Sequence, residues 1–278
     1  MNYFERAKQY RAKKRLGQNF LTDGEVIDDI IEAADIQPDD IVVEIGAGLG
    51  FVTEQLVDYA KKVIAIELDE DMVRELQKIK ADNLEIVHAD ILKTDISQFG
   101  DNIKIVANIP YYITSPIIAH LVGEVDDLNN KNRNSISEIV MMTQYEAAKR
   151  ITADETAEQK AYGLLSILAQ FYADVEMVRF VGAKSFFPSP KVNSAVIKFR
   201  VRKEPLLRLS DYSFFKKVAK ACFGTRRKNL KNSLAVGGFS KEVIQKALNE
   251  LNIPETVRGE TLSIAKIGEL SEKLKENL

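Results

Sequence analysis

The sequence predicts an α/β fold with a mostly parallel sheet, followed by a smaller all-helical domain. Short runs of β-branched and aliphatic residues recur along the first half of the chain, and segments with helical spacing separate them. Strand and helix in alternation are typical of a parallel sheet that helices cover on both faces. After Pro205 the strand signals stop, and the remaining segments have the apolar spacing of helices.

The strands can be placed by residue range. A capping-box pattern of Thr22 and Glu25 predicts a first helix that ends before Pro38. Two late strands are joined by a Pro-containing segment too short for a helical crossover, which predicts an antiparallel final pair. The predicted strands are 41–45, 62–67, 84–89, 103–108 and 136–142, and then 175–181 and 193–201.

We place a domain boundary near residue 205. Residues 1–205 would form the α/β domain, with residues 1–22 as a basic N-terminal arm. Residues 206–278 would form the helical domain. Its predicted helices are 211–223, 226–235, 240–251 and 262–276.

Length and composition indicate a globular chain. It has 278 residues, of which 45% are hydrophobic, enough to fill a proper core. No apolar run approaches the roughly 18 residues that cross a bilayer, and nothing near the start reads as a secretory signal. We therefore expect a cytoplasmic protein without a membrane partner. The single cysteine, Cys222, excludes an internal disulfide, and two histidines argue against a zinc site or any other metal.

The net charge of −2 gives no hint of a polyanionic partner, but the charges are unevenly distributed. The first fifteen residues hold six basic residues against Glu5 alone. Residues 216–231 contain Lys216, Lys217, Lys220, Arg226, Arg227, Lys228 and Lys231 and no acid. A solvated helix face would explain one such run, but the two together favour a nucleic-acid surface.

A glycine-rich turn follows the first strand in "VVEIGAGLGF". Such a turn lets the backbone approach a bound nucleotide closely. The dinucleotide pattern would need Gly or Ala where Phe51 stands. Glu44 precedes the glycines, and a carboxylate there opposes a pyrophosphate but suits a cation. S-adenosylmethionine, with its sulfonium and ammonium and no phosphate, is such a ligand.

Two more acids follow the next strands. Glu67 ends the second strand about 20 residues after the glycines, where a carboxylate can accept ribose hydroxyls. Asp90, in "HAD", could accept from the adenine amino group. Either acid alone would more commonly begin a helix or loop. Three such sites after three successive strands favour the ligand reading.

The stretch "NIPYY" closes the fourth strand. The Asn108 side-chain oxygen and the neighbouring main-chain carbonyl can each accept an N–H of an exocyclic amine, and Pro110 fixes the turn. Tyr111 offers a face on which a base can stack. Such a clamp suits transfer to an adenine amine, with most of the rate coming from alignment. Without the glycine loop, a Pro turn with core aromatics would be the better reading.

The sequence resembles the ribosomal RNA adenine dimethyltransferase family over nearly its whole length. The shared motifs are "KKRLGQNFL", "VVEIGAGLG", the acid at Glu67, "HAD", "NIPY", "FFPSPKVNSAV" and "FGTRRKNLKNSL". The resemblance implies a Rossmann-like class I methyltransferase domain, with a seven-stranded sheet and an antiparallel final hairpin. Tyr112 departs from the family, in which this position often carries a smaller or polar side chain.

The resemblance also implies site residues. The base would be held by Asn108, Ile109, Pro110 and Tyr111, with Phe186 on its other face, although Phe187 is an alternative. The RNA would contact Arg226, Arg227, Lys228 and Lys231. S-adenosyl-L-methionine would be bound by Gln18, Asn19, Leu21, Gly46, Gly48, Glu67, Leu68, Asp90, Ile91 and Asn108.

The motifs favour the enzymes that dimethylate two adjacent adenines near the 3′ end of 16S rRNA. The partner would be the small ribosomal subunit or its precursor, and the enzyme would be a monomer. Alternatives are a methyltransferase of 23S rRNA of the antibiotic-resistance type, or an RNA-binding assembly factor that has lost catalysis. A DNA adenine methyltransferase usually reads Asp-Pro-Pro-Tyr at this loop. A hydrolase is disfavoured because no G-x-S-x-G is present.

Overall fold

The chain forms two compact units in the computed structural model, which describes residues 2–157, 161–225 and 228–278. The first unit comprises Met1–Val122, Asn129–Lys149 and Ala173–Lys203. The second unit comprises Gly123–Leu128, Arg150–Tyr172 and Glu204–Leu278. The sequence predicted one cut near 205, but two earlier segments join the helical unit as well, because their side chains pack among its helices.

The first unit is built on a mostly parallel seven-stranded sheet, as predicted, and its strand order is β4-β3-β2-β5-β6-β9-β7. The pairs from β4 to β6 are parallel, and β9 runs antiparallel to both of its neighbours. The strands are β2 (Ile41–Ile45), β3 (Lys62–Glu67), β4 (Leu84–His88), β5 (Ile103–Asn108), β6 (Ile136–Gln144), β7 (Ala173–Val181) and β9 (Ser194–Val201).

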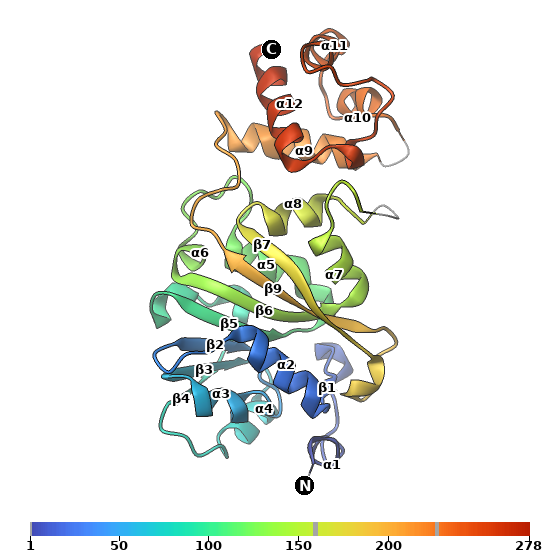
Figure 1. Cartoon of the computed structure of the whole chain (residues 1–278). Helices are drawn as coiled ribbons and strands as arrows, with labels where there is room; N and C mark the ends of the chain where they lie inside the picture. The colour runs from blue at the N-terminus through green and yellow to red at the C-terminus, as the bar shows by residue number, and fades with distance from the viewer. Residues whose placement is uncertain (1, 158–160, 226–227) are drawn as a thin grey trace. The chain divides into compact units, whose positions relative to one another are not determined.

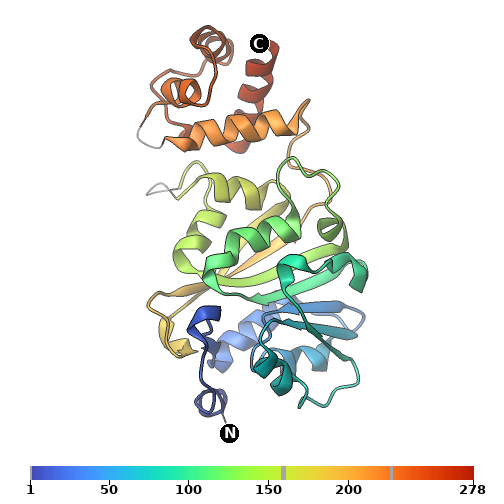
Figure 2. The same cartoon turned by 180° about the vertical axis from the view of Figure 1, so that it is seen from behind.

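The central strands are buried on both faces, which explains why they read as continuous apolar runs. Val42 and Val43, neighbours on β2 that point to opposite faces, are both fully buried. Helix α2 (Gly24–Ala34) crosses the face of the sheet presented in Figure 1, and α5 (Thr114–Val122) crosses the opposite face, seen in Figure 2.

Helix α2 begins one residue later than the capping-box pattern predicted. Asp23 is its N-cap residue, and the Thr22 hydroxyl instead donates to the Ser185 carbonyl at 3.2 Å. The capping-box prediction was therefore wrong, because Thr22 belongs to an extended segment next to β1 (Phe20–Leu21), which pairs with β8 (Phe186–Phe187). The main helices of this unit, besides α2 and α5, are α1 (Tyr3–Ala7), α3 (Thr53–Tyr59), α4 (Glu70–Leu76) and α6 (Lys131–Ser135).

Short 3-10 turns complete the first unit. They are η1 (Lys14–Leu16), η2 (Ile91–Lys93), η3 (Ile96–Phe99), η4 (Tyr111–Ile113) and η6 (Ala183–Ser185). Helix α7 (Tyr145–Thr152) contains the change of unit after Lys149.

The second unit is helical. Helices α9, α10 and α12 pack together around apolar side chains such as Phe215, Leu234 and Ile267, all fully buried. Cys222 is buried in α9 and unpaired. Among the described residues, no helix is both long enough and apolar enough for a bilayer span. The helices are α8 (Leu164–Gln170), α9 (Tyr212–Gly224), α10 (Leu230–Val236), α11 (Lys241–Glu250) and α12 (Ile264–Glu276), with the turn η7 (Gly259–Thr261).

Candidate active site

The first unit contains a cavity at the carboxyl ends of its parallel strands, where open α/β sheets bind their ligands. It holds about 1140 Å³ of space, part of it open to solvent. The segments after β2, β3, β4 and β5 all reach it. It is lined by Leu16 to Leu21, Glu44 to Leu49, Phe51, Val52, Ile66 to Leu68, Ala89 to Ile91, Asn108 to Pro110, Tyr112, Ile113 and Ile117.

The glycine turn after β2 brings the backbone against the end of β5. Gly46 has φ +74°, and its N–H donates to the Ile66 carbonyl at 2.9 Å. A Cβ at Gly46 would lie 2.7 Å from the Asn108 carbonyl oxygen, too close for any side chain. The left-handed conformation and the close approach both require glycine here. The glycine turn is therefore packed directly against the backbone of Asn108.

Glu67 fixes the glycine turn to the loop after β3. Its Oε1 accepts the N–H groups of Leu68 and Asp69, and its Oε2 accepts the N–H of Gly48, each at 2.8 Å. Burial raises the pKa of Glu67, and these backbone hydrogen bonds oppose that rise. With two lone pairs on each oxygen, Oε1 is filled and Oε2 keeps one position for a further donor.

Glu44 is a buried acid in the cavity wall. It is 4% exposed, and its Oε2 accepts a hydrogen bond from the Thr53 hydroxyl at 2.5 Å. Burial raises the pKa of Glu44 to about 8, with the nearby charge of Glu67 adding to the rise. Two acids in one apolar wall disfavour an anionic ligand and favour a cationic one.

The raised pKa of Glu44 predicts a loss of stability as the pH rises. An ordinary glutamate, as in the unfolded chain, titrates near 4.5, whereas Glu44 in the folded chain titrates near 8. Between these two pH values the folded state binds more protons than the unfolded state does. The free energy of unfolding therefore falls as the pH rises, by on the order of a few kcal/mol by pH 9. We expect Glu44→Gln to remove most of this fall, measured by urea unfolding at pH 6 and pH 9.

A matched control for Glu44→Gln is Glu32→Gln, which changes an exposed acid on α2. That variant should keep the pH dependence of the wild type. Parallel pH curves for the wild type and Glu44→Gln would contradict the assignment to Glu44.

The N-terminal arm is held beside the cavity by Asp69. The Lys13 ammonium contacts the Asp69 carboxylate at 2.5 Å, and the Gln18 amide donates to it at 2.7 Å. The Gln18 side-chain oxygen in turn accepts the Lys13 N–H at 2.8 Å. Burial opposes ionisation of Asp69, but these donors lower its pKa. Gln18 thus lines the cavity while both ends of its amide hold the arm in place.

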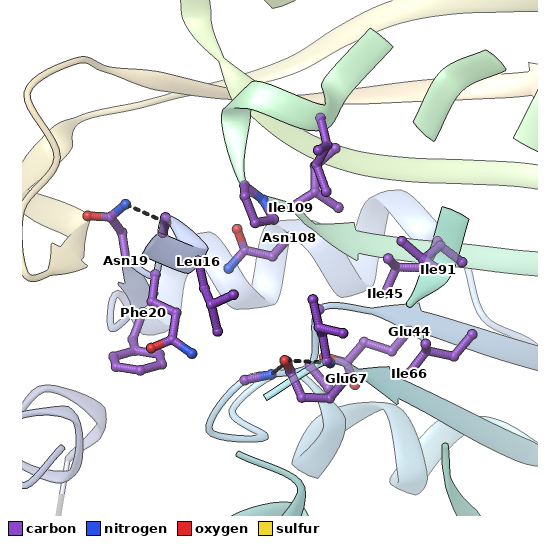
Figure 3. A pocket seen from close by; sticks show the side chains of 18 of the residues that line it. Leu16, Asn19, Phe20, Glu44, Ile45, Ile66, Glu67, Ile91, Asn108 and Ile109 are labelled. Atoms are coloured by element: carbon purple, nitrogen blue, oxygen red, sulfur yellow. Dashed lines mark hydrogen bonds between the residues drawn. The ribbon is translucent and has the colours of Figure 1, made fainter. Parts of the chain in front are cut away.

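Asn108 ends β5, and its side chain extends into the cavity toward the segment that carries Leu16 and Asn19 (Figure 3). Its amide makes no hydrogen bond with the residues that the structure describes. Ile109 and Pro110 also line the cavity, and the Pro110 carbonyl accepts the Ile113 N–H at 3.2 Å. The amide is thus free to meet a ligand.

The structure brings together all the cofactor residues named from the sequence. Asp90 lines the cavity while one of its oxygens caps η2 by accepting the Leu92 N–H at 3.0 Å. The Asn19 amide donates to the Gly17 carbonyl at 3.0 Å, drawn as a dashed line in Figure 3. The cavity is also lined by Leu21, Gly48, Leu68 and Ile91.

Phe186 and its alternative Phe187 are not among the residues that line the cavity. Phe186 is 3% exposed and packs in the core cluster that includes Phe20 and Leu21. Phe187 packs against the same cluster and meets the Phe4 ring edge-on. The side chain of Tyr111 lies outside what the structure describes. A stacking role for either Phe186 or Tyr111 stays a prediction.

Sequence reasoning missed several cavity residues. Leu16 and Phe20 form apolar parts of the cavity wall. Tyr112 lies at the rim of the cavity, with 66% of its surface exposed. The Lys13–Asp69 ion pair was also missed, because nothing in the spacing of the two residues shows that the arm folds back onto the loop between β3 and α4.

The histidines and possible metal ligands do not add to the site. His88 contacts the Leu68 carbonyl at 3.1 Å and His120 the Thr94 carbonyl at 2.8 Å, and neither ring lines the cavity. In the described part of the chain, no group of three or more His, Cys, Asp or Glu side chains is placed to bind a metal.

Comparison with known proteins gives consistent matches. The family described as ribosomal RNA adenine dimethylase matches residues 9–275. A protein named Ribosomal RNA small subunit methyltransferase A, from Clostridium acetobutylicum, is 41% identical over 270 residues, which are 95% of this chain and 94% of that protein. One of the same name from Alkaliphilus metalliredigens is 38% identical over 276 residues, 96% and 93% of the two chains.

Two solved structures resemble this chain over most of its length. A dimethyladenosine transferase from Plasmodium falciparum is 28% identical, with a TM-score of 0.77, and the match covers 93% of this chain and 98% of that one. The 23S rRNA methyltransferase ErmE is 28% identical, with a TM-score of 0.69, and the match covers 92% and 100%. The predicted Rossmann-like methyltransferase fold is confirmed.

Proposed function

The chain belongs to the ribosomal RNA adenine dimethylase family, and from this premise we propose its function. It transfers methyl groups from S-adenosylmethionine to the N6 amines of two adjacent adenines near the 3′ end of 16S rRNA. The product is N6,N6-dimethyladenosine, made during small-subunit biogenesis. The observation that carries the proposal is a single cavity that joins the Gly46 turn and the acids Glu44, Glu67 and Asp90 to the unbonded amide of Asn108.

The cavity wall fits a cationic cofactor without phosphate. S-adenosylmethionine, when bound, would supply a methyl group on its sulfonium sulfur. A cationic ligand beside Glu44 and Glu67 favours their ionised forms, which burial alone disfavours, so the positive charges of the cofactor and the two carboxylates stabilise one another. The open position on Glu67 Oε2 accepts one ribose hydroxyl, and the Asp90 oxygen that does not cap η2 accepts the adenine amino group. Gly46 and Gly48 let the backbone approach the ligand.

The remaining proposed contacts come from the arm and the strand ends. Leu68 and Ile91 cover the faces of the cofactor's ribose and adenine. Gln18, Asn19 and Leu21 close the cavity from the arm side, and Asp69 holds them there through Gln18 and Lys13. Cofactor binding therefore depends on an ordered arm.

Asn108 and the neighbouring carbonyl orient the target amine. As the nitrogen becomes tetrahedral and gains positive charge, its N–H groups need acceptors already in place. The Asn108 oxygen has no competing partner among the described residues, so it is available to accept a hydrogen bond from the amine. Holding the amine in line with the methyl carbon contributes roughly 7–11 kcal/mol through proximity and orientation. No strong base is required, because the alkylated amine loses its proton readily.

The proposed RNA contacts lie on the helical unit. Lys228 is exposed, whereas the Lys231 ammonium already contacts Gln245 and Glu255, each at 2.7 Å. Arg226 and Arg227 lie outside the described residues. We assign the domain of residues 206–278 to the RNA backbone, with salt-dependent binding. The partner is 16S rRNA in the small subunit or its precursor, and the enzyme acts as a cytoplasmic monomer.

The similarity to ErmE makes a 23S rRNA target the second candidate. Radiolabelled methyl transfer to undermethylated small and large ribosomal subunits in parallel, followed by nucleoside analysis, decides between the two. We expect N6,N6-dimethyladenosine in the small-subunit RNA only. Label on the large subunit would favour the second candidate, and label on neither would favour a non-catalytic RNA-binding factor.

A further inference from the structure

We propose that Tyr112 and the basic turn Lys14–Arg15 form a rim subsite for the nucleotide next to the target adenine. The inference rests on the proposed function and names a further part of its RNA site. In this subsite the Tyr112 ring stacks on an unpaired purine, and the two cations bind the phosphate that joins this nucleotide to the target.

Tyr112 is an aromatic ring held at the mouth of the cavity. It is 66% exposed, it lines the same cavity as Asn108 and Pro110, and its hydroxyl has no partner among the described residues. An exposed ring at the mouth of a site offers a flat apolar face, and a ligand that covers it gains free energy from burying apolar surface. Base stacking on such a ring is tolerant of sequence, because every base has a π-face.

The ring lies directly against the N-terminal arm. A Cβ at Gly17 would lie 3.3 Å from the Pro110 Cβ and 3.5 Å from the Tyr112 ring. Gly17, with φ +63°, thus lets the arm approach the turn after Asn108. The two segments together form one edge of the cavity, and a strand leaving the cavity over this edge passes both.

The cations of the arm fall into two groups. Arg6 pairs with Glu54 at 2.6 Å, and Lys13 pairs with Asp69 at 2.5 Å, so these two hold the arm in place, while Lys8 pairs within the arm with Glu5 at 3.2 Å. Arg11, Lys14 and Arg15 are exposed and form no ion pair with any residue that the structure describes. Charges that hold the fold are thus separate from charges that are available to a partner.

The free cations lie within reach of the nucleotide that Tyr112 would bind. Arg15 is two residues from Gly17, so their Cα atoms are at most about 7 Å apart. Lys14 and Arg15 border a second hollow, between the arm and α4, that begins beyond Leu16. A strand that left the cavity over the Gly17 edge would pass the Tyr112 ring and come near Arg15, two residues along the arm.

The first test measures RNA affinity and methyl transfer for Tyr112→Ala and Tyr112→Phe. We expect Tyr112→Ala to raise the KM for undermethylated small subunits roughly 5- to 100-fold, with S-adenosylmethionine affinity unchanged by calorimetry. Tyr112→Phe, which keeps the ring, should behave as the wild type. The control Tyr59→Ala removes another exposed aromatic that does not line the cavity, and it should change nothing.

A second measurement does not depend on catalysis. A single-stranded oligoadenylate carrying one 2-aminopurine reports stacking through its quenched fluorescence. The wild type should quench it and Tyr112→Ala should not. Replacing Lys14 and Arg15 by Gln should reduce the slope of log affinity against log salt by about 0.7, because the two cations bind one phosphate. Lys61→Gln, at an exposed cation on another part of the first unit, should leave the slope unchanged.

The two proposals fail in different ways. If the wild type transfers no methyl group to either subunit but quenches the probe through Tyr112, the proposed function is wrong and the rim subsite stands. If methyl transfer proceeds and Tyr112→Ala keeps both the wild-type KM and the quenching, the rim subsite is wrong.

Discussion

Replacement of Asn108 by Ala is expected to lower the turnover number by at least about 100-fold, with S-adenosylmethionine binding retained. A preorganised polar group that meets charge developing in the transition state typically contributes a factor of 10²–10³. The Asn108 amide extends into the cavity with no partner among the described residues, so its removal leaves the fold intact. Single-turnover methyl transfer and calorimetry with the cofactor measure the two quantities separately.

Asn108→Asp is the matched comparison, since it keeps an acceptor oxygen in the same place while it replaces the amide NH2 by a second, ionisable oxygen. We expect its turnover to lie above that of Asn108→Ala. Near-normal turnover in Asn108→Ala would remove the amine-clamp role, and equal losses in both variants would mean that an acceptor oxygen at this position is not sufficient.

The strands of the sheet could be predicted almost residue by residue. Buried parallel strands need apolar side chains on both faces, so β2 and β5 are rich in Ile and Val, with Glu44 and Lys104 as exceptions. The antiparallel placement of β9 also followed from the sequence, because too few residues separate it from β7 for a crossover.

The sequence could not show which segments of the chain make up the helical unit. Arg150–Tyr172 and Gly123–Leu128 precede the last strands in the chain, yet they group with Glu204–Leu278. The Tyr172 hydroxyl, for example, donates to the Val125 carbonyl at 3.2 Å. Such grouping depends on which distant side chains meet, and helical periodicity indicates only that a helix has an apolar face.

The site was predictable where it follows from topology. Parallel strands bring their carboxyl ends to one edge, so Glu67, Asp90 and Asn108 had to lie near the Gly46 turn. The sequence could not show that Asp69 holds Lys13 and Gln18, because this contact joins residues more than fifty positions apart.

The two phenylalanines of "FFPSP" are residues whose burial the sequence could not predict. In "FFPSP" two identical side chains alternate across a strand, and their pattern alone does not say which one is buried. The structure buries Phe186 in the core and leaves Phe187 partly exposed. The family resemblance assigned the base-stacking role to the more buried of the two, so that role now needs a test by substitution at both positions.

Gly46→Ala is expected to lower the affinity for S-adenosylmethionine by at least about tenfold and to destabilise the fold by about 1–3 kcal/mol. The new Cβ would lie 2.7 Å from the Asn108 carbonyl oxygen, and φ +74° is itself strained for alanine. Either the turn or the end of β5 must move, and the hydrogen bond from Gly48 to Glu67 moves with the turn. Calorimetry with the cofactor and urea unfolding measure the two effects.

Gly182→Ala is the control for this substitution. Gly182 has φ −69°, and a Cβ there would meet no atom within 4 Å, so alanine should change neither stability nor binding. Because the turn contacts the backbone of Asn108, which orients the target amine, Gly46→Ala should also slow methyl transfer at saturating cofactor. A folded Gly46→Ala with normal turnover at saturation would show that cofactor binding and amine alignment are independent, although one backbone contact joins them.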